Sequence, residues 1–391
     1  MARLLERWHI LDAVRECAVP LHALSSRRYA DDTELARVSM LDVEKAYGAP
    51  ILVIHRADLQ FIMKKKAEEL GAQIILGFLV EDIDFDTPRI KVKGYSEWFE
   101  TDLVIAADGI KSIIRKKMFE SEYLDDQIRE TGDAAWRAVI PSEQIYQSND
   151  ASLIQAIEEN MSLRWMGPSG HIMVYPIRSH TLLNMVLLHP DEPGTLESWT
   201  MKGDKSKMVA FYKNWNDRVR RLIDCISNDD IIEWKLCDHA PLVTWVKGKV
   251  ALIGDAAHPM LPYVAQGAAQ AVEDSAVLST CLALIDTKDE IPTALKAYEL
   301  VRKERAEIVQ MSAAKTRLVL HLHDGEEQQK RDEVLRNVQK GGVSPDLWSD
   351  KSFQDWCWVS KIQHVYIVAM VSSRALMFKS KCFKCGILSK P

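Results

Sequence analysis

Two aspartates, Asp108 and Asp255, each stand next to a glycine at the end of a short apolar run, a position from which they could bind a ligand. Before Asp255, residues 250–253 have the pattern of a buried strand that ends in a turn. A loop of small residues follows, and Gly267 and Ala268 open a predicted helix. The start of a helix leaves backbone N–H groups and a partial positive charge free, so this arrangement suits a negatively polarised group.

The elements that position Asp255 are therefore a strand, a loop and a helix, in that order. The predicted helix runs from Ala268 to about Ala283 and has no bulky side chain in its first turn. Small residues allow a flat ligand to lie against the backbone. The plain alternative is an ordinary strand–helix unit with an aspartate in its turn, and a lone Gly-Asp pair would not exclude it.

The longer string GDAAHPMLPYVAQGAAQAVED, residues 254–274, is more informative. It resembles the second flavin-binding motif of the single-component flavoprotein aromatic hydroxylases, the salicylate-hydroxylase-like FAD monooxygenases, over nearly the whole motif. The resemblance implies that Asp255 binds the ribityl-pyrophosphate part of FAD and that Gly267 and Ala268 meet the N1–C2=O edge of its ring. Reduced flavin collects negative charge at that edge, where a helix dipole stabilises it.

The second string, ETDLVIAADGIKSIIRK, contains Asp108. Residues 103–107 predict a buried strand, Asp108 and Gly109 a tight turn, and Ser112 to Met118 a helix, so a helix-capping aspartate is the plain interpretation. The string also resembles the Asp-Gly motif of the same family. That resemblance implies that Asp108 and Arg115 lie near the FAD pyrophosphate and the path of the nicotinamide cofactor.

A third segment, YGAPILVIHRADL, contains His55 and Arg56 at the start of a helix predicted to reach Leu70. The plain interpretation is a solvated pair at a helix start, which Asp58 helps to stabilise. In the family this segment carries an arginine that contacts FAD, and Arg56 is the matching position. Residues 73–76 and 89–92 are predicted as further strands of an α/β layer.

From about residue 134 to 190 the chain is rich in short β segments, WRAVI, SLRWM, HIMVYPI and LLNMVLL, separated by turn residues. They predict an antiparallel sheet inserted between the two flavin-binding parts, where the family has its substrate domain. Arg137 and Tyr175 are the candidate catalytic residues, because related hydroxylases supply polar groups for a phenolic substrate from these segments. The alternative is that both side chains simply pack against neighbouring residues.

Composition excludes several functions for this chain of 391 residues with a formal net charge of −6. That charge provides no electrostatic footprint for nucleic acid, and no apolar window is long enough to span a membrane. Five scattered cysteines are typical of a reduced, cytoplasmic protein. Cys382 and Cys385 lack a second pair, so we expect no metal site. Three further predictions follow from periodicity and polarity: one amphipathic helix through residues 4–14, one long helix over residues 294–320, and a loop-like segment over residues 321–350.

The predicted fold class is α/β: an incomplete Rossmann-like FAD-binding domain with an inserted antiparallel β-sheet substrate domain. It is incomplete because none of the 17 glycines forms a G-x-G pair, so the dinucleotide fingerprint is absent. The expected parts are the first part of the FAD-binding domain (1–130), the substrate domain (131–240), the second part of the FAD-binding domain (241–325) and a tail (326–391).

The resemblance implies an FAD-dependent monooxygenase that hydroxylates an aromatic or other electron-rich small molecule, such as one made in secondary metabolism, with NAD(P)H and O₂. We expect no nucleic-acid partner and no membrane insertion, and the oligomeric state stays open. Two alternatives remain: a non-catalytic remnant of the family, or a different flavin oxidoreductase on the same scaffold. Because the fingerprint supplies much of the affinity for the ADP half of FAD, we expect the chain to purify without bound flavin.

Overall fold

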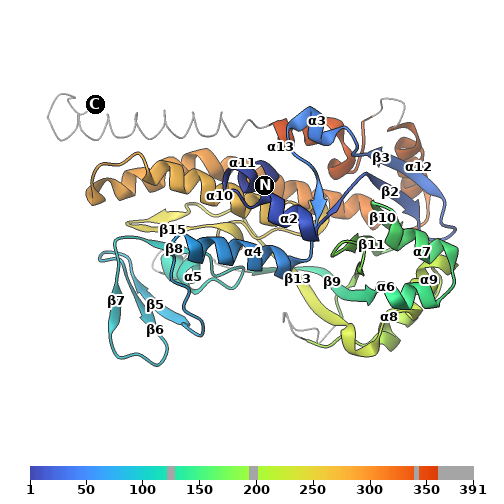
Figure 1. The fold of residues 1–391 in the computed structure, drawn as a ribbon, viewed down its shortest axis with the longest axis horizontal. Coiled ribbons are helices and arrows are strands. Elements are labelled where there is room, and N and C mark those ends of the chain that lie inside the picture. The colour runs from blue at the N-terminus through green and yellow to red at the C-terminus, as the bar shows by residue number, and fades with distance from the viewer. Residues whose placement is uncertain (121–127, 193–200, 339–342, 360–391) are drawn as a thin grey trace.

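The computed structural model describes residues 1–120, 128–192, 201–338 and 343–359 (Figure 1). The predicted Cys382–Cys385 pair therefore lies outside the described residues. The fold is mixed α/β, as predicted. A large sheet lies at one end of the molecule and a small three-stranded sheet at the other, and long helices connect the two ends (Figure 1). No helix within the described ranges is long and apolar enough to cross a membrane.

The large sheet has seven strands in the order β13-β9-β12-β11-β10-β2-β3. All neighbours are antiparallel except β10 and β2, which pair in parallel, so the sheet is mixed. Two of its strands come from the segment before residue 130, although the sequence placed the sheet wholly after it. The strands are β2 (Ala23–Arg28), β3 (Glu34–Ser39), β9 (Ile128–Pro141), β10 (Met161–Gly167), β11 (Gly170–Ile177), β12 (Leu182–Pro190) and β13 (Ile232–His239).

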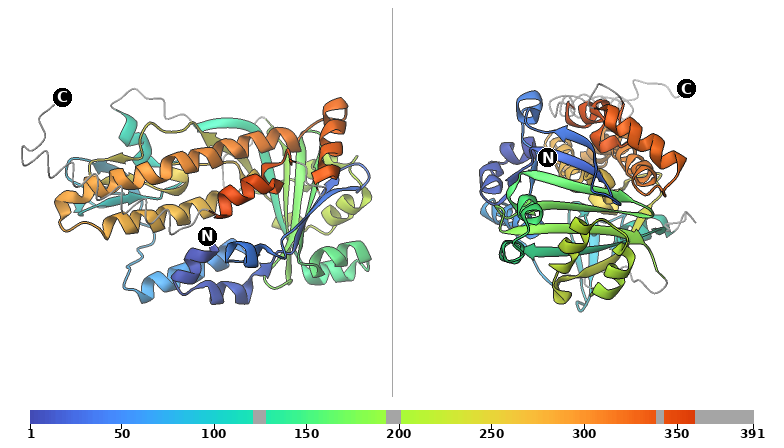
Figure 2. Two further views of the ribbon diagram at one scale, coloured as in Figure 1. Left: turned by 90° about the horizontal axis from the view of Figure 1, so that it is seen from above. Right: turned by 90° about the vertical axis from the view of Figure 1, so that its right-hand side faces the viewer.

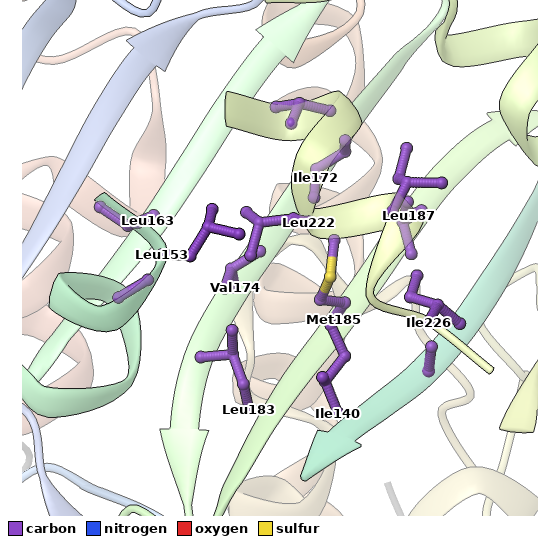
Figure 3. Packing of buried hydrophobic residues seen from close by; sticks show 14 of the residues in the cluster. Ile140, Leu153, Leu163, Ile172, Val174, Leu183, Met185, Leu187, Leu222 and Ile226 are labelled. Carbon is purple, nitrogen blue, oxygen red and sulfur yellow. The ribbon is translucent and has the colours of Figure 1, made fainter. Parts of the chain in front are cut away.

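The two faces of this sheet have different partners, because successive side chains of a strand point to opposite faces. One face packs its apolar side chains against helices (Figure 3). Ile140, Ile172, Val174 and Met185 lie on it and are at most 1% exposed. The other face carries the polar side chains described below. The helices packed against the apolar face are α7 (Ala151–Glu158), α8 (Lys205–Tyr212) and α9 (Asp217–Asp224), with α6 (Ser142–Gln147) beside them.

A second layer contains the motifs that resemble flavin-binding segments. Its three-stranded sheet has the order β14-β15-β8, and β15 runs parallel to β8. A separate antiparallel sheet, β5-β6-β7, projects beyond it, and β1 pairs with β4. The bounds are β1 (Val19–Pro20), β4 (Leu52–Val53), β5 (Val80–Asp84), β6 (Arg89–Val92), β7 (Trp98–Glu100), β8 (Val104–Ala106), β14 (Val246–Lys247) and β15 (Val250–Leu252).

Helix α11 (Ile291–Leu320) has 30 residues and runs along most of the molecule beside α10 (Gly267–Leu282) (Figure 2). Its apolar positions pack on both layers. The remaining helices are α1 (Ala2–Arg7), α2 (Leu11–Cys17), α3 (Val43–Tyr47), α4 (Arg56–Glu69), α5 (Ile113–Phe119), α12 (Glu326–Val338) and α13 (Lys351–Val359), with the 3₁₀ turns η2 (Asn228–Asp230), η3 (Gly254–Ala256), η4 (Pro262–Val264), η5 (Lys288–Glu290) and η6 (Leu347–Ser349).

Three local predictions were wrong. The first amphipathic segment forms two helices, because His9 adopts φ 57° and interrupts it. Residues 73–76 form no strand, although residues 89–92 do, as β6. A strand needs a neighbour to bond its backbone groups, and residues 73–76 have none in the described chain. The segment after residue 320 is not only loop, because it contains α12.

Candidate functional site

Asp255 lies in the turn η3, directly after β15, where the sequence placed it. Gly254 makes this turn with φ 57°, a conformation that favours glycine. The side chain of Asp255 is exposed, although neighbouring protein atoms partly desolvate its carboxyl group. Desolvation therefore raises the pKa of Asp255 above its usual value, while the nearby His258 and Arg56 act in the opposite direction.

The start of α10 is open to a ligand. The helix begins at Gly267, as predicted; its N-cap Gln266 makes no side-chain capping bond, and its first turn holds no acidic residue. Ala268 is exposed and Gly267 is half-buried. The first N–H groups of a helix have no partner within the helix, so these can bind an electron-rich edge of a ligand.

A buried network of charges holds the turn that carries Asp255. Asp274, on α10, accepts hydrogen bonds from the backbone N of Gly254 (2.9 Å), from Nε2 of His258 (2.6 Å) and from Nε of Arg302 (2.8 Å). Asp274 and Arg302 are 0% exposed. Burial alone would raise the pKa of Asp274, but His258 and Arg302 outweigh it and the pKa is lowered. The carboxylate is thus ionised and anchors the turn to two helices.

Asp108 occupies the turn between β8 and α5. Its Oδ2 accepts from the backbone N of Ile113 (2.9 Å) and of Ile114 (3.3 Å), so it caps α5. Ser112 adds the N-cap bond to Arg115. This is the plain interpretation of Asp108, and its contact with FAD stays a prediction. Its side chain is exposed on the same edge of the layer as the Asp255 turn, since β8 and β15 are neighbours.

The buried guanidinium of Arg115 links the two turns. It donates to the backbone oxygen of Ile110 and, over 3.1 Å, to that of Ala256. One arginine therefore holds the Asp108 turn and the Asp255 turn together. A second guanidinium, that of Arg56 at the start of α4, is exposed and forms no ion pair among the residues that the structure describes. Its charge is close enough to influence the pKa values of Asp255, Arg137 and Tyr175.

Arg137 and Tyr175 lie on the polar face of the large sheet. The strand register pairs Tyr175 with Asn184, and Val186 with Arg137, so all these side chains share one face. Nε of Arg137 donates to Oδ1 of Asn184 over 3.3 Å. The structure therefore brings the two predicted residues together, with Asn184 between them.

Asn184 was missed from the sequence. Its side chain is 1% exposed, yet its Nδ2 has no hydrogen-bond partner within the described ranges. The hydroxyl of Tyr175 and the terminal nitrogens of Arg137 likewise form no bond to any described residue. The signal was available, since Asn184 is a lone polar residue in the apolar string LLNMVLL. A buried polar group without a partner is unusual, and a bound ligand would explain it.

Arg137, Asn184 and Tyr175 form a trio in which burial shifts the pKa values of the two titratable members, Arg137 and Tyr175. Burial lowers the pKa of the Arg137 guanidinium from its ordinary value, and the nearby Tyr175 counters this. Burial also raises the pKa of Tyr175, while Arg137 and Arg56 oppose the shift. At neutral pH the trio therefore offers a cation, a phenol O–H and an amide N–H, all able to donate to one acceptor oxygen.

These features fit FAD on one side and a small aromatic ligand on the other. The free start of α10 and the accessible Asp255 suit the ring and ribityl parts of FAD, and the charge of Arg56 acts on both Asp255 and the sheet residues Arg137 and Tyr175. The loop of η4 packs on the polar face of the sheet through Leu261 and Tyr263, so the flavin motif and the trio lie near each other. Among the described residues, no group of His, Cys, Asp and Glu side chains is arranged to hold a metal ion.

Comparisons with known proteins agree with this arrangement. Residues 1–313 match the family model described as FAD binding domain. The chain is 37% identical over 306 residues to FAD-dependent monooxygenase atnJ of Arthrinium sp, covering 78% of this chain and 71% of the relative. It is 32% identical over 346 residues to 3-amino-4-hydroxybenzoate 2-monooxygenase PtmB3 of Streptomyces platensis, covering 87% and 81%. A structure of a salicylate hydroxylase substrate complex has the same fold, with TM-score 0.76 and 24% identity over 94% of this chain and 88% of that one.

Proposed function

Because this chain belongs to the family of FAD-dependent monooxygenases, we propose that it hydroxylates an aromatic or other electron-rich small molecule with NAD(P)H and O₂. Members of the family bind FAD and use NAD(P)H as co-substrate. The observation that carries the proposal is the trio of Arg137, Asn184 and Tyr175: apart from the Arg137 Nε–Asn184 bond, its donors have no partner among the described residues.

The residues that would hold FAD are Asp255, Arg56 and the start of α10 at Gly267 and Ala268, with Asp108 at the neighbouring turn. When bound, FAD supplies the redox chemistry and the activation of O₂ that no amino-acid side chain provides. The start of α10 contributes partial positive charge, which stabilises an electron-rich ring edge. Asp255 contributes an acceptor for hydroxyl groups, and Arg56 a positive charge.

The substrate class follows from the donors of the trio. Three donors facing one region suit an oxygen that carries negative charge, as in a phenolate or a benzoate. Arg137 would bind that oxygen, and Tyr175 would orient it by a hydrogen bond. A phenolate makes its ring electron-rich, which favours hydroxylation of a ring carbon. The name of the Streptomyces relative, a 3-amino-4-hydroxybenzoate 2-monooxygenase, supports an aromatic substrate of this kind.

The test replaces the donors singly, as Arg137→Met, Asn184→Leu and Tyr175→Phe. Turnover should fall by about 10-fold to 100-fold for Arg137→Met, the range for losing a hydrogen bond to a charged group, while bound flavin stays unchanged. NAD(P)H oxidation and product formation are measured with 3-amino-4-hydroxybenzoate and 3-hydroxybenzoate as probes. Arg129→Met is the matched control, because Arg129 lies on the same strand but pairs with Asp238 at 2.9 Å.

The same measurements separate the alternatives. If the variants turn over at the parent rate, the trio packs the sheet and does not bind substrate. Bound flavin without hydroxylation would indicate a different flavin oxidoreductase, and a chain that takes up no flavin would indicate a non-catalytic member of the family. The cytoplasmic location and the domain boundaries stay predictions.

A further inference from the structure

The turn between β11 and β12 has an unusual backbone. Arg178, Ser179 and His180 adopt φ values of 48°, 50° and 67°, in the left-handed region. None is a glycine or an asparagine, the residues that tolerate this region best. Such a conformation is unfavourable for residues with a side chain and persists only where the surroundings impose it. Within the turn, N and Oγ1 of Thr181 both donate to the backbone oxygen of Arg178, and further contacts come from outside it.

Each of the strained residues is tied to a different helix. Arg178 donates to Asp58 of α4 from both Nε (2.8 Å) and a terminal nitrogen (2.7 Å). Ser179 donates to the backbone oxygen of Glu16 in α2 (3.1 Å). His180 bonds the backbone oxygen of Ile157 in α7 through Nδ1 (2.6 Å). The turn is thus a junction between the large sheet and the helices around it.

The junction connects the two halves of the candidate site. On the sheet, Tyr175 and Asn184 face each other on the strands that lead into and out of this turn. On α4, Asp58 lies in the first turn of the helix, beside Arg56. Tyr175 and Asn184 are therefore linked through this turn and the Arg178–Asp58 ion pair to the start of α4, which carries Arg56.

We propose that Arg178 and Asp58 form a positioning pair that sets Arg56 at its place between the flavin site and the substrate-facing trio. The inference rests on the proposed function, because it assigns Arg56 to the cofactor. The bidentate geometry fixes direction as well as distance, which a lysine could not do. An ordinary surface ion pair would contribute little to stability and nothing to cofactor binding.

The test measures the FAD dissociation constant by flavin fluorescence in Arg178→Ala, Arg178→Lys and Asp58→Asn. We expect FAD binding to weaken about fivefold in Arg178→Ala, in line with the coupling of residues in one network, with partial rescue in Arg178→Lys. The double variant Arg178→Ala/Asp58→Asn should lose no more than either single variant. Visible circular dichroism of the bound flavin should change with the affinity, which a purely structural loss would not produce.

Arg15→Ala is the matched control. Arg15 pairs with Glu44 at 2.6 Å, and its side chain is 43% exposed, against 44% for Arg178, but its partner lies away from the flavin motifs on α3. If Arg178→Ala and Arg15→Ala bind FAD equally well, the positioning role is excluded. A parent chain that binds no FAD would overturn the proposed function, whereas a parent that binds FAD as tightly as Arg178→Ala would overturn only the positioning role, so the two failures are distinguishable.

Discussion

The two sides of the candidate flavin site are built differently, although both are turns that lead from a strand to a helix. On the buried side, formed by β15, η3, α10 and α11, the Asp255 turn rests on fully buried Asp274 and Arg302. On the open side, where β4 leads into α4 and residues 70–79 follow, no α4 side chain is fully buried. Ile75 and Leu76 are 62% and 82% exposed there.

This difference shows that neighbouring ligand contacts can depend on very different supports. The position of Asp255 is fixed by the buried Asp274–Arg302 network, so only a change that disturbs this network should move it. Arg56 lies on a helix whose apolar side chains Leu59, Ile62 and Met63 are only partly buried, against α1 and α2. Its position should therefore depend more on surface contacts, the Arg178–Asp58 pair of α4 among them. Mutations should therefore act through stability on the buried side and through local geometry on the open side.

The largest effect is expected from Asp274→Ala, which removes the centre of the buried network. His258 and Arg302 would be left as buried polar groups without their shared partner, at a cost of about 3–5 kcal/mol. Urea unfolding followed by far-ultraviolet circular dichroism measures the loss. Asp102→Ala is the control, because Asp102 pairs with Lys288 in an exposed bridge and should change stability little. Equal losses in both variants would contradict the comparison.

Acid should weaken the buried framework beyond the flavin motif, through His321 at the end of α11 and His189 on β12. Burial lowers the pKa of each ring from 6.5 to about 4. The unfolded chain therefore binds these protons first, so stability falls as the pH drops below about 6.5 and the loss is complete near 4. The difference between the two pKa values corresponds to a loss of about 3 kcal/mol of unfolding free energy for each ring. The unfolding free energy of His321→Asn should depend less steeply on pH across this range than that of the parent. An unchanged pH dependence would refute the role of His321.

Asp255→Ala should separate binding from stability on the buried side. Losing a hydrogen bond between FAD and a charged group weakens FAD binding by about 1.5–3 kcal/mol, or tenfold or more. The melting temperature of the flavin-free protein should stay near that of the parent, because the side chain is accessible. Equilibrium dialysis and thermal unfolding give the two numbers. Unchanged flavin retention would remove Asp255 from the site.

The smallest effect is expected on the open side, from Leu76→Lys. An exposed side chain without partners contributes little, so stability should change by no more than about 0.5 kcal/mol, and solubility should improve. The buried counterpart is Leu252→Ala, at a residue that is 0% exposed, which should lose about 2–5 kcal/mol. Thermal unfolding of both variants measures the contrast directly. A large loss in Leu76→Lys would show that residues 70–79 are packed against something in solution.

Local signals in the sequence predicted the buried side well. The apolar run before Gly254 and the small residues after Gly267 are sufficient to predict β15 and α10, because each pattern is contained in a few consecutive residues. The open side was harder. The apolar pattern of residues 73–76 predicted a strand, but a strand also needs a neighbour, and that information is not local.

The candidate site was predicted in part. Arg137 and Tyr175 came from the family resemblance, and the register brings them together; their roles stay predictions. Asn184 was missed because its importance depends on which residues lie opposite it across strands. The turn at Arg178 carries no glycine, proline or asparagine and contacts three helices, so periodicity could not indicate its left-handed backbone. Both features depend on contacts between residues far apart in the sequence, which local patterns do not contain.

The parallel pairing of β2 with β10 also means that β2 must wait for its partner strand during synthesis. Their paired residues Ser26 and Arg164 are 138 positions apart. At typical ribosomal speeds, β2 and β3 leave the ribosome on the order of ten seconds before β10. A two-stranded unit is barely stable alone, and its free edge can pair with another nascent chain. The yield of folded protein should therefore rise when chaperones shield that hairpin until β10 has been synthesised.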